Sequence, residues 1–257
     1  MSARPGQGRQ GPAVIISHTY RFVFLHIPKC AGKSVRRYIM TADPSAVSYW
    51  GWDWDERFQR FVDMAHRPLL DLPDKDLEAV RTYPTCAIVR DPVARFASAV
   101  GQHFHQHSYR IRRTADEMLD EITSIKIRHD PAYIHFCPMN AYTHIGDTKL
   151  ADTVLHLEDP DWKAGLNRFL QEQGAPLPEG EVGHRNRRSS DQGKPEAPED
   201  VTRLAALYAR DFELFGYPGP EIPLRTVNLK TEQGWDNAVD FGNLDTVRFL
   251  GRRMTRR

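Results

Sequence analysis

The residues with the clearest chemical potential lie in one turn, Lys29 to Ser34, which follows the apolar run Phe22–Ile27. The run is typical of a buried strand, and a helix is expected to begin near Lys33. A strand that passes through a short turn into a helix points backbone N–H groups and the positive helix end at one place. Lysines at such a bend add full positive charges. The segment therefore predicts a binding site for a phosphate-like anion.

A nucleoside-triphosphate loop is one reading of this turn, because Ala31–Ser34 spells the end of the pattern G-x-x-x-x-G-K-[ST]. That pattern requires a glycine five residues before Gly32, and the chain has Ile27 there, still inside the strand. A turn this short does not wrap a triphosphate. A kinase or NTPase is therefore kept only as an alternative.

The segment Phe24–Ser34 resembles the 5′-phosphosulfate loop of sulfotransferases that use PAPS (3′-phosphoadenosine 5′-phosphosulfate), in the carbohydrate-type, family 2-like branch. The pattern there reads F-x-H-I-P-K-T-G-G-T-S, and here the letters are FLHIPKCAGKS. The resemblance implies that PAPS is the cofactor and that the loop binds it through Lys29, Cys30, Ala31, Gly32, Lys33 and Ser34. Lys33 is the main departure from the pattern: it either shares the work of Lys29 or lies on the solvent face of the helix.

A second strand–helix junction follows at Thr85–Val89 and the residues after it. Asp91 is expected to cap the next helix and Pro92 to be its first residue. The strand ends in Arg90, whereas an NTPase would place an acidic residue for Mg²⁺ at such a strand end. This junction therefore argues against a kinase or NTPase.

The letters from Ile88 to Ser98, IVRDPVARFAS, resemble the family's 3′-phosphate motif, I-V-R-D-P-x-x-R-x-x-S. The resemblance implies that Arg90 and Ser98 hold the 3′-phosphate of PAPS. A guanidinium suits this task because it binds phosphate oxygens in a bidentate manner. Arg95 lies between them, and a structural ion-pair role and a functional role both stay open.

Two further segments resemble the family downstream. Asp152–Glu158 is expected to be a strand that ends in a glutamate, and His184–Ser190 resembles an H-x-N-x-S loop before a last helix, Asp200–Tyr217. In relatives that loop lies near the cofactor, which implies four more PAPS contacts: Arg185, Asn186, Arg188 and Ser189. The alternative is a solvated basic loop with no ligand.

The general base is expected to be His66, which together with Lys29 completes the predicted catalytic residues. His66 lies between the two phosphate motifs, where uronyl 2-O-sulfotransferases of the family also have a histidine. An imidazole titrates near neutral pH and therefore suits proton removal from an acceptor. Asp63 and His26 are alternatives, and His66 is otherwise an ordinary residue at a helix end.

The elements that must position these residues predict an α/β fold. Strands are expected at Arg21–Ile27, Thr85–Val89 and Thr153–Leu157, and amphipathic helices at Glu56–His66 and Ala115–Lys126. Helices between strands imply a central parallel sheet in a three-layer arrangement flanked by helices, with ligands at the carboxyl ends of the strands. By resemblance this is the P-loop NTPase-like sulfotransferase fold.

The domain organisation follows from composition. Residues 1–14 are expected to be a disordered tail, residues 15–220 the PAPS-dependent sulfotransferase domain, and residues 221–257 an extension that acts as a cap, a lid or an oligomer arm, so that a homo-oligomer is possible. Residues 174–199 read as a long loop, consistent with a flap over the cofactor.

Charge and cysteine content limit the partners and the compartment. The formal net charge of +1 over 257 residues predicts no nucleic-acid partner, and no apolar run is long enough for a membrane span. The three cysteines show no pairing pattern, which favours a reducing compartment. The lack of an apolar targeting segment or span favours a cytoplasmic, bacterial protein over a trimmed lumenal domain. His103, His105 and His107 fall on a predicted helix and scatter around it, so no metal is expected.

The function implied by the resemblance is in-line transfer of a sulfuryl group from PAPS to a hydroxyl or amine, which leaves adenosine 3′,5′-bisphosphate. The acceptor is a carbohydrate, a glycolipid or another small molecule such as a secondary metabolite. The aromatic run Tyr49–Trp54 is either a stacking surface for a ring or part of the core. A nucleotide-binding module without catalysis is a further alternative.

Overall fold

The computed structural model of the chain describes residues 14–48, 51–55, 59–107, 114–123, 133–180, 197–199 and 201–219. Four predicted cofactor contacts, Arg185, Asn186, Arg188 and Ser189, lie outside the described residues, as do residues 1–13 and the extension 221–257. The structure therefore bears on the two phosphate motifs and on the proposed base, but not on those segments.

A four-stranded sheet forms the centre of the molecule, with the order β1 (Ile15–Ser17), β2 (Phe22–Leu25), β5 (Thr85–Val89) and β8 (Thr153–His156). The strands β2, β5 and β8 run parallel, and β1 is an antiparallel edge strand. β2 and β5 are buried along their whole length, as their continuous apolar sequences predict. The three predicted strands and their parallel arrangement are confirmed, while the antiparallel β1 was not predicted.

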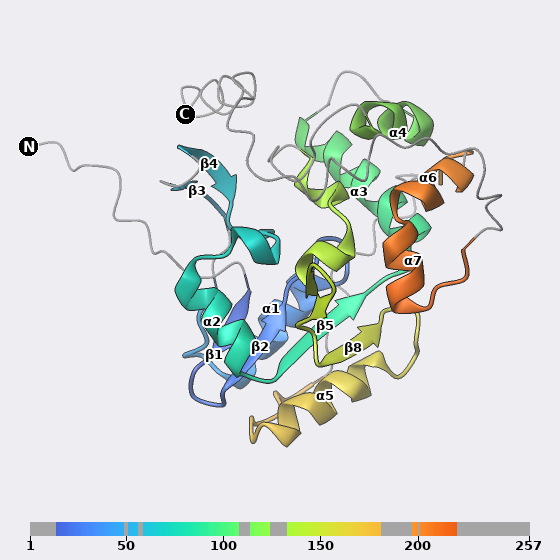
Figure 1. The fold of residues 1–257 in the computed structure, drawn as a ribbon. Coiled ribbons are helices and arrows are strands. Elements are labelled where there is room, and N and C mark those ends of the chain that lie inside the picture. The colour runs from blue at the N-terminus through green and yellow to red at the C-terminus, as the bar shows by residue number, and fades with distance from the viewer. Residues whose placement is uncertain are drawn as a thin grey trace, which may run out of the picture.

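Helices flank this sheet in an α/β arrangement (Figure 1). They are α1 (Gly32–Ala42), α2 (Asp74–Thr82), α3 (Pro92–His107) and α5 (Trp162–Glu172). Phe169 of α5 stacks edge-on against Phe22 of β2, and the Tyr38 hydroxyl of α1 donates to Asn167 of α5 at 2.9 Å. α1 and α5 thus pack side by side against the sheet.

A second apolar cluster lies beside the sheet and joins α3 to α4 (Ala115–Thr123), α6 (Val201–Leu207) and α7 (Ala209–Phe215). Short elements complete the chain between them: η1 (Leu69–Asp71), η3 (Ile134–Phe136), η4 (Met139–Tyr142), β6 (His144–Ile145) and β7 (Thr148–Lys149). The predicted helix Ala115–Lys126 is confirmed as far as Thr123, beyond which the residues are not described.

The helix predicted at Glu56–His66 is wrong. Instead, two short strands pair there as an antiparallel hairpin, β3 (Trp52–Asp55) and β4 (Arg60–Asp63). Aromatic residues at alternate positions favour a strand over a helix, and Trp54 packs edge-on against Phe61 with ring centroids 5.5 Å apart. His66 therefore lies in the turn after β4 and not at a helix end.

Two further observations concern the described part of the chain. None of its helices has the length and hydropathy needed to cross a bilayer. Cys30, Cys86 and Cys137 are all buried and form no disulfide there.

Candidate active site

The turn after β2 presents backbone donors to one point. Lys29 and Ala31 have φ angles of 69° and 62°, in the left-handed region that costs a non-glycine residue free energy. α1 begins at Gly32 with no side-chain cap and no acidic residue in its first turn. Among the described residues, nothing accepts from the N–H groups of Ala31, Gly32 and Lys33. Three unpaired donors at a positive helix end form a cradle for an anion.

Gly32 is required here by a close contact with His26. A Cβ atom at position 32 would lie 1.8 Å from His26 Nε2. His26 cannot easily move, because it is buried and its Nδ1–H donates to the Ala65 carbonyl at 2.9 Å. Burial, with a further contribution from His66, holds the pKa of His26 well below its ordinary value. His26 thus supports the turn as a neutral ring and is a poor candidate for the base.

The side chains of the turn differ in where they point. Lys29 is half-buried and its Nζ donates to Gln102 of α3 at 3.2 Å, whereas Lys33 is exposed. Cys30 is buried, and its thiol donates to the Pro28 carbonyl at 3.6 Å. Burial raises the pKa of Cys30 to about 12, so it stays a neutral thiol in the core. Lys29 is therefore the turn's cation at the site, and Cys30 can offer a ligand only its backbone.

Arg90 brings the second motif against the first. It follows β5, which is hydrogen-bonded to β2, and its Nη1 donates to the Lys29 carbonyl at 3.4 Å. The Asp91 carboxylate accepts from the Ala94 N–H at 2.7 Å and α3 begins at Pro92, so the predicted cap is confirmed. Ser98 is half-buried, two turns into α3. The two predicted phosphate sites thus share one edge of the sheet.

Arg95 has a structural position. It is fully buried, and its partners are backbone carbonyls: Pro28 at 3.1 Å, His135 at 3.1 Å and Cys137. The guanidinium also lies 5.9 Å from the centre of the Tyr208 ring. These contacts support the structural alternative for Arg95, although through carbonyl oxygens and not through an acidic partner.

His66 is held by Asp63 in the manner of a catalytic dyad. Its Nδ1–H donates to Asp63 Oδ2 at 2.7 Å, and Asp63 Oδ1 accepts from the Ala65 N–H at 3.0 Å. The side chains of His66 and Asp63 are 12% and 8% exposed. Since the proton on Nδ1 is fixed by the carboxylate, Nε2 carries the lone pair that can accept another.

Two more histidines surround His66, and one of them was not predicted. The ring centroids of His26 and His135 lie 4.9 and 4.7 Å from that of His66. His135 belongs to η3, far along the chain from His66, and no local pattern around it signals a site. Only the folded arrangement brings it to the turn after β4.

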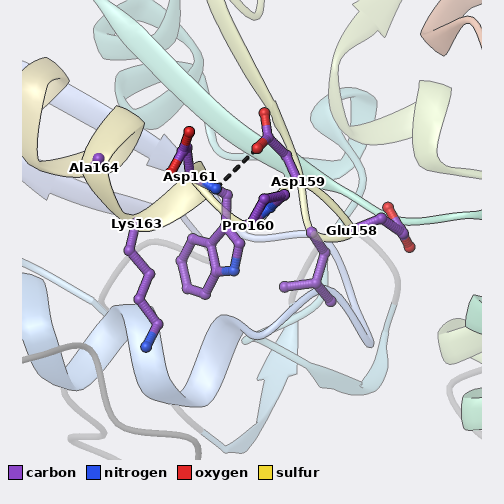
Figure 2. A pocket seen from close by; sticks show the side chains of 8 residues that line it. Glu158, Asp159, Pro160, Asp161, Lys163 and Ala164 are labelled. Carbon is purple, nitrogen blue, oxygen red and sulfur yellow. Dashed lines mark hydrogen bonds between the residues drawn. The ribbon is translucent and has the colours of Figure 1, made fainter.

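A hollow at the carboxyl end of β8 is not suited to phosphate (Figure 2). Residues Leu157–Ala164 line it, among them the carboxylates of Glu158, Asp159 and Asp161 against the single lysine Lys163. Asp159 accepts from the Asp161 N–H at 2.8 Å, and Glu158 accepts from the Asp91 N–H at 2.9 Å. A surface of this charge repels an anionic nucleotide, so the cradle at Lys29 is the better site.

Taken together, the fold is α/β, and both predicted phosphate motifs lie at the carboxyl ends of its parallel strands β2 and β5. The chain belongs to the sulfotransferase family: the model of that family (sulfotransferase family 2) matches residues 12–218. No curated protein and no solved structure gives a match. The predicted family and fold are confirmed, and the chain is a transferase of sulfuryl groups in general terms.

Proposed function

We propose that this sulfotransferase moves a sulfuryl group from PAPS to a hydroxyl or amine of a carbohydrate, a glycolipid or a secondary metabolite. The observation that carries the proposal is the contact between the two phosphate motifs, Arg90 Nη1 to the Lys29 carbonyl at 3.4 Å. It brings a second cation beside an anion cradle, which suits a nucleotide with phosphates at both its 5′ and 3′ positions.

The donor set fits PAPS, which when bound supplies an activated sulfuryl group on a phosphate leaving group. The unpaired N–H groups of Ala31, Gly32 and Lys33 would receive the 5′-phosphate, with the Ser34 hydroxyl beside them. Lys29 would neutralise the negative charge that grows on the bridging oxygen. Its contact with Gln102 holds the ammonium near the cradle before any ligand arrives.

Arg90 and Ser98 would hold the 3′-phosphate. The guanidinium of Arg90 is only half-buried, so its remaining N–H groups can face a ligand. Arg185, Asn186, Arg188 and Ser189 stay predicted contacts outside the described residues.

Proton removal from the acceptor is assigned to His66. Asp63 fixes the tautomer in which Nε2 is the basic atom, and it stabilises the ring once that atom is protonated. The cations and dipoles of the loop suffice for charge stabilisation, so the reaction as proposed needs no metal. We keep the proposal of a cytoplasmic, bacterial protein; the three buried free cysteines are compatible with the reducing compartment that this requires.

Ligand-dependent melting of the full chain tests the cofactor. Adenosine 3′,5′-bisphosphate should raise the melting temperature in a saturable way, because it binds only the folded protein, and ATP with Mg²⁺ should not. The reverse result would reject the proposal in favour of an NTPase-like protein.

A transfer assay tests the reaction itself. It measures movement of the labelled sulfuryl group from PAPS to each member of a panel of sugars, glycolipids and phenols. Binding without transfer to any acceptor would support the inactive module instead.

A further inference from the structure

Asp63, His66 and His135 bring three metal-ligating groups together beside the phosphate loop. One ligand atom from each lies within 4.8 Å of the other two. Two imidazoles and one carboxylate are a donor set that suits zinc and its neighbours among the divalent transition metals. We propose that these three side chains bind such an ion, with zinc as the representative, and that the bound ion stops His66 from accepting a proton. The second half of this statement rests on the proposed function.

The pair Asp63 and His66 is nearly in position for chelation. Asp63 Oδ1 is engaged by the Ala65 N–H at 3.0 Å, which turns Oδ2 toward His66 Nδ1 at 2.7 Å. Bonds of about 2.0 to 2.1 Å from one tetrahedral ion would separate two such atoms by about 3.3 Å. Replacing the shared proton by the ion therefore needs a shift of only about 0.6 Å.

The backbones of His66 and His135 are also held in place. The Tyr142 hydroxyl donates to the His66 carbonyl at 3.1 Å, and buried Arg95 donates to the His135 carbonyl at 3.1 Å. The two imidazole rings are tilted by 57° with centroids 4.7 Å apart, so they are not stacked face to face. Supports of this kind lower the cost of organising ligands around a metal.

His26 is not a fourth ligand, although its ring also lies beside His66. Its Nδ1–H donates to the Ala65 carbonyl, and its Nε2 lies against Gly32. Three protein ligands leave one position of a tetrahedral ion for water or an acceptor hydroxyl. The 12% exposure of His66 gives solvent ions a route to the site. With the ion on Nδ1 of His66, the ring proton that Nδ1 gives up moves to Nε2. Nε2 then has no lone pair for the acceptor proton, so the ion would inhibit transfer.

Cobalt(II) titration of the full chain, stripped of metals by a chelator, tests the site without any need for activity. Co²⁺ should give visible absorption bands that saturate at one equivalent and disappear when Zn²⁺ is added. The bands should be lost in His135→Gln and in Asp63→Asn, while the matched control His18→Gln, an exposed histidine on the β1–β2 turn, should keep them. Circular dichroism establishes that each variant is folded. Absence of the bands in the wild type, or their persistence in both site variants, would overturn the site.

Inhibition of PAPS turnover by Zn²⁺ tests the second half of the proposal, that the bound ion stops His66 from accepting a proton. Wild-type turnover should fall as Zn²⁺ is added and return with a chelator, and His135→Gln should need at least about tenfold more Zn²⁺ for the same inhibition. Equal sensitivity of His135→Gln and the wild type would overturn the inhibitory role. A chain that binds Co²⁺ as expected but never transfers sulfuryl groups would count against the proposed function and leave the metal site in place.

Discussion

Arg95 donates from Nε to the carbonyl oxygen of Pro28 at 3.1 Å, in the middle of the protein core. The same guanidinium donates to the carbonyls of His135 and Cys137. One buried side chain therefore joins the phosphate loop to the segment that places His135 against His66. The cofactor side and the acceptor side of the proposed site share this support.

Arg95→Lys should destabilise the protein strongly, because one ammonium cannot serve three carbonyls that a planar guanidinium reaches at once. A buried carbonyl left without a donor costs about 1 to 3 kcal/mol, so we expect a loss of about 3 kcal/mol in the free energy of unfolding. Urea denaturation measures it. The control Arg81→Lys, at an exposed position of α2, should stay within about 0.5 kcal/mol of the wild type. Equal stability of the two variants would contradict a structural role for Arg95.

Gly32→Ala should disturb the turn through His26. The added Cβ would lie 1.8 Å from His26 Nε2 and 2.0 Å from its Cδ2, so the ring or the start of α1 must shift. We expect a loss of at least about 2 kcal/mol of stability and a smaller melting shift with adenosine 3′,5′-bisphosphate. The double variant His26→Ala with Gly32→Ala should be more stable than the sum of the two single changes predicts. Additive losses would show that the contact is not the cause.

Asp211 should make stability depend on pH. The residue is fully buried and accepts from the N–H groups of Met139 and Asn140, and burial raises its pKa to about 6. The folded state thus holds the proton to a higher pH than the unfolded state, in which the pKa is about 3.9. The stability linked to this proton is present below pH 4 and is lost as pH rises through 6.

Unfolding free energies of the wild type and Asp211→Asn between pH 4 and 7 check this dependence. Asn keeps one acceptor oxygen and does not titrate, so the variant should be less stable throughout. The advantage of the wild type should shrink as pH rises, by up to about 1.4 kcal/mol per pH unit, and become constant above pH 7. An advantage that grows with pH would contradict the raised pKa.

The elements that could be predicted from the sequence are those whose evidence is local. β2 and β5 were predictable because their apolar runs are continuous, and the start of α3 because Asp91 and Pro92 form a standard helix beginning. The hairpin β3–β4 was missed because charged residues between its aromatics also fit a helical period. Local periodicity does not include the cross-strand pairing that decides such a case.

Several features of the site could not be predicted because they depend on tertiary contacts. Nothing near His135 in the sequence indicates that it lies against His66, since tertiary contacts such as the bond from Arg95 to its carbonyl hold it there. The requirement for Gly32 comes from the His26 ring and not from the φ angle of the glycine itself. The sequence also left the position of Lys33 open, and the structure places that side chain on the exposed face of α1.

Asp63→Asn should lower kcat by reversing the tautomer of His66. If the amide oxygen keeps the Ala65 N–H, the NH₂ group faces Nδ1 and can only donate to it. The ring proton then moves to Nε2, where a lone pair is needed. We expect kcat to fall by about 10² or more in chelator-treated buffer, with little change in the KM for PAPS.

The controls separate this orientation effect from general damage. Asp74→Asn, at an exposed position of α2, should leave kcat within about twofold of the wild type. Combining Asp63→Asn with His66→Gln should cost no more than His66→Gln alone, because Asp63 acts through His66. Additive losses in the double variant would contradict that dependence.

Lys29 and Arg90 should affect different kinetic constants, although the two residues are in contact. Lys29→Ala removes the charge beside the leaving phosphate, so kcat should fall by about 10² to 10³. Arg90→Ala removes a ligand of the 3′-phosphate, so the KM for PAPS should rise by about 10- to 100-fold with a smaller change in kcat. Adenosine 3′,5′-bisphosphate should then stabilise Arg90→Ala less than the wild type, by up to about 2.7 kcal/mol if its affinity falls 100-fold. Lys75→Ala and Arg81→Ala, both at exposed positions of α2, remove the same charges away from the cradle and should match the wild type in both constants.

Two outcomes would contradict these roles. Wild-type turnover in Lys29→Ala would reject the role assigned to Lys29. Equal losses of kcat in both variants at an unchanged KM would reject the division of the two phosphates between them.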